Sequence, residues 1–173
     1  IPKYCPVCGG LTEVVKENES EVLMCTNPKC SGKLLGRLKF FVSKPAVNID
    51  GLSEATWEFL ITERWVKRFK DIYHLEDHRY EWEQFDGFGQ KSVDKILKSI
   101  EESRNITCAN FITALSIDGV GKSAAKTISD AFNGDFYEFI EAFDNGFDWT
   151  TLTDIGDKTA QNINEYLTEN HVE

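Results

Sequence analysis

Ile117-Asp118-Gly119-Val120-Gly121 is the stretch that decides how most of this 173-residue chain folds, because its form recurs. The form is apolar, polar, Gly, apolar, Gly, and the first and last copies each carry one substitution. The other copies are Ile49-Asp50-Gly51-Leu52-Ser53, Phe85-Asp86-Gly87-Phe88-Gly89 and Leu152-Thr153-Asp154-Ile155-Gly156. Their near-constant spacing indicates an array of similar structural units.

Helical periodicity accompanies the copies. After the second, third and fourth copies, apolar residues recur at spacings of three and four, which marks one buried helix face each time. The first copy ends on Ser53, which can cap a helix, with Leu52 before the cap and Trp57 inside the helix. Strand signals beyond residue 44 are weak, so this region is expected to be helical. Additional helices are expected at residues 33–42, 107–115 and 135–143.

Four cysteines form two close pairs near the start of the chain. Cys5-Pro6-Val7-Cys8 is followed, after sixteen residues, by Cys25-Thr26-Asn27-Pro28-Lys29-Cys30. This pattern is typical of a Cys₄ zinc site, and residues 11–15 and 21–24 between the pairs alternate as two short strands would. Four thiolates leave no open position for water, so the single zinc ion is expected to be structural. The alternative, two disulfides, is disfavoured because nothing marks the chain as secreted. The predicted ligands are Cys5, Cys8, Cys25 and Cys30.

Composition and charge set broad limits. No stretch approaches the roughly 18 apolar residues of a membrane helix. The chain has no signal peptide and does not begin with Met, so we expect a cytoplasmic protein and a piece of something longer. The formal net charge of −10 argues against nucleic acid, but residues 134–173 contribute −9 and residues 1–44 contribute +3. A DNA contact is therefore compatible with the part of the chain before its acidic end.

The repeated form is similar to the helix-hairpin-helix motif, whose chemistry follows from its residue types. Glycine reaches backbone conformations closed to other residues, so a tight turn of bare backbone can approach a phosphate closely. The next helix begins at once, and its free N–H groups and positive dipole end face the same anion. A lysine after the last glycine adds a point charge, and the central apolar residue attaches the turn to the core. The DNA-binding residues predicted on this basis are Gly87, Phe88, Gly89, Lys91, Gly119, Val120, Gly121, Lys122, Gly156 and Lys158.

Two copies depart from this pattern. Ser53 replaces the second glycine of the first copy, and no lysine closely follows it. Asp154 replaces the first glycine of the fourth copy, where Asp157 also lies beside Lys158. We therefore expect the second and third copies to provide most of the phosphate contact.

A Cys₄ finger followed directly by four such motifs resembles the C-terminal half of bacterial NAD-dependent DNA ligases, over essentially the whole chain. Besides the two cysteine pairs, the matching stretches are Asn48-Ile49-Asp50-Gly51-Leu52, Phe88-Gly89-Gln90-Lys91-Ser92 and the segment from Ala114 to Gly121. The expected fold class is mainly α: a small β-rich Cys₄ zinc finger at residues 1–36, then an all-helical array of four helix-hairpin-helix motifs at residues 37–173.

The resemblance implies a division of labour within a nick-sealing enzyme of DNA replication and repair. Other domains of the same ligase chain would carry NAD and Mg, while these motifs would hold duplex DNA through its backbone and minor groove. The family's adenylation signature is Lys-x-Asp-Gly, and the nearby lookalike begins with Asn48 in place of the lysine. No catalytic residue is therefore expected here, and the fragment alone should be inactive.

Two alternatives come from other classes of protein. Tandem motifs of this kind also occur in repair nucleases and junction-binding proteins, so the chain could be the DNA-binding module of one of these. It could instead be a helical protein-interaction scaffold that has lost DNA binding.

Overall fold

The computed structural model describes residues 1–17 and 19–170. Its first part is a small antiparallel sheet, in which Thr12 pairs with Cys25 and Glu17 with Ser20. An isolated bridge joins Tyr4 to Leu11. Compared with the predicted segments 11–15 and 21–24, the first strand begins one residue later and ends two residues later, and the second is one residue longer at each end. They are β1 (Thr12–Glu17) and β2 (Ser20–Cys25).

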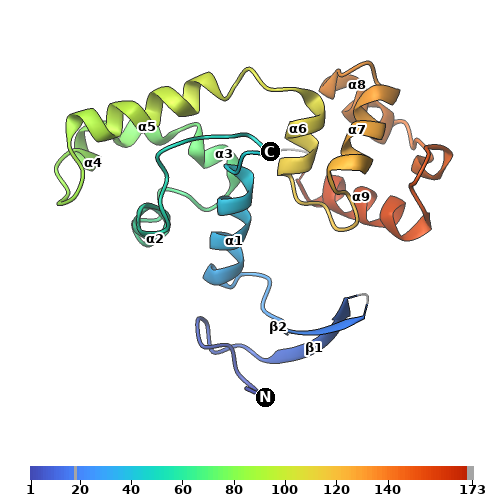
Figure 1. Ribbon diagram of the computed structural model, residues 1–173, viewed down its shortest axis with the longest axis horizontal. Coiled ribbons are helices and arrows are strands. Elements are labelled where there is room, and N and C mark those ends of the chain that lie inside the picture. Colours follow the sequence, from blue (N-terminus) through green and yellow to red (C-terminus); the bar gives the residue numbers. More distant parts are fainter. Residues whose placement is uncertain (18, 171–173) are drawn as a thin grey trace.

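A helix joins this sheet to the rest of the chain. Figure 1 shows α1 (Ser31–Phe41) rising from the strands towards two groups of helices, one on each side. Leu38 and Phe41 near its end are buried in the first helical core, whereas Phe40 is partly exposed. The boundary predicted between residues 36 and 37 falls inside α1, and the division into domains there stays a prediction.

The first lobe, defined here as α1 to α5, has an aromatic core. Trp57, Trp82 and Phe41 are fully buried in it, and Phe88 and Trp65 pack against it. The short elements between α2 and α5 have no clear sequence periodicity, and the sequence did not predict them. After α1, the elements are α2 (Glu54–Thr62), α3 (Phe69–Ile72), η1 (Leu75–His78), α4 (Arg79–Trp82) and α5 (Gln90–Glu102).

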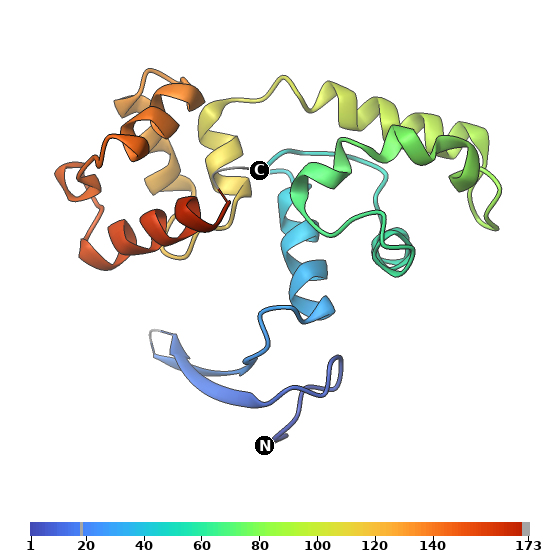
Figure 2. The ribbon, with the colours of Figure 1, turned by 180° about the vertical axis from the view of Figure 1, so that it is seen from behind.

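The second lobe, defined here as α6 to α9, has its own core around Trp149 and Phe139. Figure 2 shows the two lobes from behind, joined by the extended segment after α5. The observed bounds lie within two residues of the predicted helices at 33–42, 107–115 and 135–143. The elements are α6 (Cys108–Ala114), α7 (Lys122–Ala131), α8 (Phe136–Asp144), η2 (Trp149–Thr151) and α9 (Asp157–Asn170).

The predicted fold class, mainly α with a small β-rich cysteine module in front, is confirmed. Among the described residues, no helix is both long and apolar enough to span a membrane.

Candidate metal centre and nucleic-acid interface

The four predicted cysteine ligands come together at the base of the sheet. Their sulfur atoms all lie within 4.8 Å of one another. Cys5 Sγ and Cys30 Sγ are 3.9 Å apart, and Cys8 Sγ and Cys25 Sγ are 3.5 Å apart. All four are free thiols, so the structure pairs them as a cluster and not as two disulfides. This donor set fits one tetrahedral metal ion held by sulfur.

Backbone N–H groups support the cluster in the same way at both cysteine pairs. Gly10 N–H donates to Cys8 Sγ at 3.4 Å. Asn27 N–H donates to Cys25 Sγ, also at 3.4 Å. These bonds favour thiolate, the form that binds metal, and the Gly10 bond helps lower the pKa of the Cys8 thiol to about 6. The Asn27 bond likewise lowers the pKa of Cys25, but burial and the neighbouring thiols outweigh it and raise that pKa to about 11.

Cys30 also begins a helix. It is the N-cap of α1, with extended backbone and no side-chain cap bond, and its carbonyl accepts from Lys33 and Leu34 N–H. A thiolate at this position faces the positive end of the helix dipole. The cysteine cluster and α1 therefore share a residue.

The four repeated turns have one backbone shape. The third position has positive φ in every copy: +89° at Gly51, +87° at Gly87, +82° at Gly119 and 65° at Asp154. Left-handed backbone of this kind favours glycine. The fourth turn therefore keeps the shape even though its sequence has lost the glycine.

Hydrogen bonds define the turn type in the last three copies. The fourth residue donates to the carbonyl of the first, from Phe88 to Phe85, Val120 to Ile117 and Ile155 to Leu152, at 3.1, 2.9 and 3.4 Å. Because φ is positive at the third position and not at the second, these are type II β-turns.

The starts of the helices differ between copies. Ser53 accepts a hydrogen bond from Thr56 N–H, so its side chain occupies the N-terminus of α2. No side-chain cap bond is present at the N-termini of α5 and α7, which begin after Gly89 and Gly121. Within the described residues, the first N–H groups of these two helices are therefore free to donate hydrogen bonds to an external anion.

The space in front of the glycines also differs from one position to another. A Cβ atom added at Gly87, Gly89, Gly121 or Gly156 would meet nothing within 4 Å. At Gly119, in contrast, a Cβ would lie 2.7 Å from Thr159 Oγ1. Of the predicted DNA-binding glycines, four are open to an approaching ligand and Gly119 serves packing.

The remaining predicted DNA-binding residues fall into two groups. Lys91, Lys122 and Lys158 are exposed, and within residues 1–17 and 19–170 no hydrogen bond or ion pair engages them. Val120 is buried and Phe88 half-buried, so these central residues attach the second and third turns to their cores.

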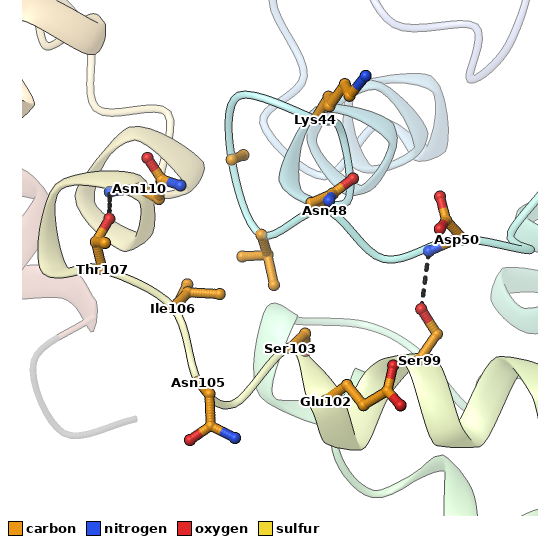
Figure 3. Close-up of a pocket in the computed structure, with 12 residues that line it drawn as sticks. Lys44, Asn48, Asp50, Ser99, Glu102, Ser103, Asn105, Ile106, Thr107 and Asn110 are labelled. Carbon is orange, nitrogen blue, oxygen red and sulfur yellow. Dashed lines mark hydrogen bonds between the residues drawn. The ribbon is translucent and has the colours of Figure 1, made fainter.

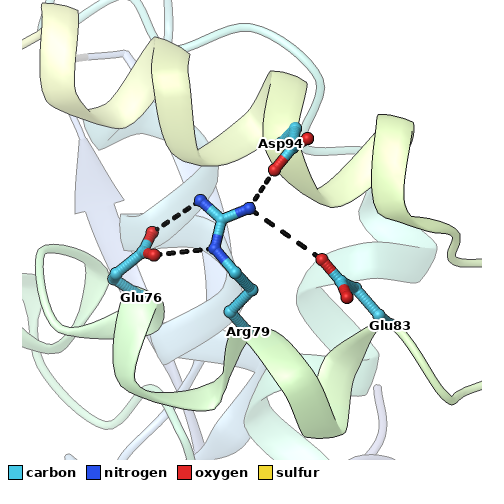
Figure 4. A network of polar contacts seen from close by, with 4 residues as sticks. All are labelled: Glu76, Arg79, Glu83 and Asp94. Carbon is cyan, nitrogen blue, oxygen red and sulfur yellow. Dashed lines mark hydrogen bonds and ion pairs between the residues drawn. The ribbon is translucent and has the colours of Figure 1, made fainter.

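An ion-pair network that sequence reasoning missed braces the second turn. Figure 4 shows Arg79, on α4, between Glu76 and Glu83 of its own segment and Asp94 of α5. Arg79 Nε and Nη2 donate to the two oxygens of Glu76 at 2.7 and 2.9 Å, and Nη1 donates to Asp94. The network therefore ties together the helices on either side of that turn. Glu76 and Glu83 stand three residues before and four residues after Arg79, a spacing that the sequence does show. Only the fold brings Asp94 to the same guanidinium group.

The first turn borders a polar cavity of about 420 Å³, next to the segment that joins the lobes. Figure 3 shows Asp50 N–H donating to Ser99 Oγ of α5, at 3.0 Å, with Lys44 and Asn48 on the same rim. This N–H of the first turn is already satisfied within the protein.

Together these features define a four-cysteine module that could hold a metal ion, joined to a helical repeat array. Within the described residues, the second and third turns of this array are followed by helix N-termini with unoccupied N–H groups and a nearby cation. No protein-family model matches the chain. Curated relatives do. The chain is 43% identical over 136 residues to a DNA ligase of Lachnoclostridium phytofermentans, a match that covers 79% of this chain and 21% of the relative.

Two further DNA ligases match almost the whole chain. The one from Thermosipho africanus is 38% identical over 96% of this chain and 24% of the relative. The one from Oceanobacillus iheyensis is 35% identical over 99% of this chain and 25% of the relative. The chain is therefore homologous to a segment of DNA ligases, and it spans about a quarter of the length of these relatives.

Proposed function

We propose that this chain is the DNA-holding, C-terminal part of an NAD-dependent DNA ligase that seals nicks during replication and repair in the cytoplasm. It grips duplex DNA through the phosphate backbone and minor groove, independently of sequence. The adenylation chemistry, with NAD and Mg, belongs to other domains of the parent chain. Names of the relatives support a ligase over a repair nuclease.

One observation carries the DNA-binding proposal. The helices after Gly89 and Gly121 begin without a side-chain cap, with open space in front of these glycines. Lys91 and Lys122 stand next to the same N-termini, and neither has a partner among the residues that the structure describes. A phosphate oxygen at each site would satisfy free N–H groups, meet a positive helix end and gain one cation.

The same geometry ranks the four motifs. The second and third combine free N–H groups, open glycines and a lysine. In the first, Ser53 fills the helix N-terminus and Ser99 engages the turn. In the fourth, Gly156 and Lys158 are open, but Asp154 and Asp157 place carboxylates nearby. We expect the fourth to contact phosphate weakly and the first hardly at all.

The metal is proposed to be one structural zinc ion on Cys5, Cys8, Cys25 and Cys30. The closed ring of thiolates gives it no position for water or substrate. The sheet above it buries little, since Val14, Val22, Leu23 and Met24 are all exposed. Metal binding would therefore supply most of the folding free energy of this module.

The decisive experiment measures binding of a fluorescent nicked duplex by anisotropy, for the wild-type chain and for Gly89→Asp, Gly121→Asp and Ser53→Asp. The two glycine variants should each weaken binding by about a factor of 10–100, because a carboxylate then faces an approaching phosphate. Ser53→Asp should change affinity less than about threefold, since Asp also caps helices well. Helical content of each variant is checked first by circular dichroism.

Two outcomes would contradict the proposal. Wild-type binding that does not weaken with salt would favour a protein-interaction scaffold, because phosphate contacts release counterions. A loss with Ser53→Asp as large as with Gly89→Asp, both folded, would show that DNA uses other surfaces. Affinity should also be equal on unrelated duplex sequences, because phosphate contacts carry no base information.

A second experiment tests the division of labour. Mixed with NAD, Mg and nicked DNA, the wild-type chain should form no AMP adduct and seal nothing, since Asn48 stands where the adenylated lysine would be. A covalent adenylate on any residue, detected by mass spectrometry, would contradict this.

A further inference from the structure

The third turn is held by the helix of the fourth motif. Asn162, on α9, donates from Nδ2 to the carbonyl oxygen of Asp118 at 3.0 Å. One turn earlier on α9, Thr159 lies against Gly119, so close that a Cβ there would be 2.7 Å from the threonine hydroxyl. Two neighbouring positions of the third turn thus contact α9.

The Asp118 carbonyl belongs to the peptide that gives a type II turn its identity. The peptide between the second and third turn positions is the one that flips between type I and type II geometry. Because the peptide is planar and trans, its C=O and N–H point in opposite directions. A donor that holds Asp118 C=O therefore aims Gly119 N–H away from α9, and that N–H has no partner in residues 1–17 and 19–170.

The third turn is alone among the four in this respect within the described residues. In the first turn, Ser99 engages the N–H of Asp50 and not its carbonyl. In the described part of the chain, no side chain bonds to the carbonyls of Asp86 or Thr153, at the matching positions of the second and fourth turns. The hydrogen bond that fixes the orientation of this peptide is thus found in the third copy, the one that precedes α7.

We propose that Asn162 is a positioning residue for DNA binding by the third turn: it fixes the Asp118–Gly119 peptide in the orientation that presents the turn to phosphate. The fourth motif, which we expect to contact phosphate only weakly, would then contribute to DNA binding mainly by positioning the third turn. This inference rests on the proposed function for its DNA-binding part, while its conformational part stands on the hydrogen bond alone.

The conformational part is tested without DNA, by amide hydrogen exchange of the full chain measured by NMR. The variant is Asn162→Ala, and Gln161→Ala is the matched control, because Gln161 is the preceding α9 residue and its side chain bonds, among the described residues, only to Glu165. The amide of Val120, which closes the third turn, should exchange about tenfold faster in Asn162→Ala. The amide of Ile155, which closes the fourth turn, should stay unchanged in both variants. An unchanged Val120 rate in Asn162→Ala overturns the proposal.

The functional part uses a double-mutant cycle on nicked-duplex affinity. Asn162→Ala should weaken binding about three- to tenfold in the wild-type background, and equally in Gly89→Asp, whose altered turn lies in the other lobe. In the Gly121→Asp background it should weaken binding no further, because the third turn is already lost. An additive loss there overturns the positioning role. If the wild-type chain binds no DNA, the proposed function fails, and the Val120 exchange rate still decides whether Asn162 sets the turn.

Discussion

The two lobes are built from the same parts, but their paired motifs meet differently. In each lobe the odd-numbered turn lies against the second helix of the following motif. In the first lobe, a Cβ on Gly51 would meet only Ile96, at 3.2 Å, an aliphatic group. In the second lobe, Gly119 meets Thr159 at 2.7 Å and an amide holds the neighbouring carbonyl. The second pair is the more tightly joined.

The even-numbered turns of the two lobes also differ, in this case in the residue at the third position. Gly87 and Asp154 both have positive φ, yet only the second motif keeps its glycine. The fourth turn has the same backbone shape as the second, although Asp154 places a carboxylate where the second turn has glycine. Backbone geometry and phosphate chemistry can therefore vary independently in one repeat array. In the first lobe the even motif carries the open site, whereas in the second lobe the odd motif does.

The largest expected effect is that of removing one cysteine ligand of the metal, and it should be larger in the first lobe than in the second. Cys25→Ser should abolish stoichiometric zinc binding and unfold the sheet module, because four thiolates supply about 10–16 kcal/mol in comparable sites. Both lobes should stay helical, and the changes in NMR shift should be largest in α1 and the core around Phe41 and smallest around Trp149 in the second core. Metal analysis and mass spectrometry check the premise: reduced wild-type protein without zinc, or two disulfides, would contradict it.

The next effect tests how tightly the turns are packed. Gly119→Ala should lower the free energy of unfolding by about 3 kcal/mol, from left-handed strain together with the contact with Thr159. Gly87→Ala has the same strain but open space, so its loss should be about 1 kcal/mol. Urea denaturation followed by circular dichroism gives both values. Equal losses would show that packing against α9 does not distinguish the third turn.

A smaller effect compares the cations of the two open motifs. Lys91→Ala and Lys122→Ala should each weaken nicked-duplex binding about three- to fivefold and reduce the salt slope by about one unit. Lys126→Ala serves as control, since Lys126 is paired with Asp130 on the exposed side of α7. Titrations at several salt concentrations supply affinity and slope together. A control effect as large as that of Lys122→Ala would point to diffuse attraction and not to a site.

The smallest effect concerns the fourth turn. Asp154→Asn keeps the size of the side chain and tolerates positive φ, while removing one exposed charge. Nicked-duplex affinity should rise less than about threefold, since an exposed charge at this distance is well screened. A tenfold gain would place the fourth turn directly on DNA and reverse its ranking.

Local sequence patterns predicted the features that depend on residues close together in the sequence. Cysteine spacing located the metal cluster, and repeated glycines located all four turns and the helices after them. The elements between residues 69 and 82 were not predicted, because their residues are fixed by aromatic packing around Trp82 and not by periodicity. The contact between Asn162 and Asp118 spans 44 residues. Only the fold brings these two residues together, so no local sequence pattern could predict their contact.

The DNA-binding residues remain predictions, but the structure sharpens their roles. The sequence treated Gly87, Gly89, Gly119 and Gly121 alike. Their surroundings divide them, because Gly119 makes room for a neighbouring helix and the other three face open space. Such a difference depends on which element packs against each turn.

The sharing of Cys30 between the metal centre and α1 has a mechanical consequence. An 11-residue helix is a rigid rod about 16 Å long, fixed at one end by a metal ligand and at the other by Phe41 in the first core. A force applied to the cysteine module would reach the first lobe as a torque, with little lost to bending. Part of that torque would also reach α6 of the second lobe, because Ala114 lies in the same buried core as Leu38 and Phe41.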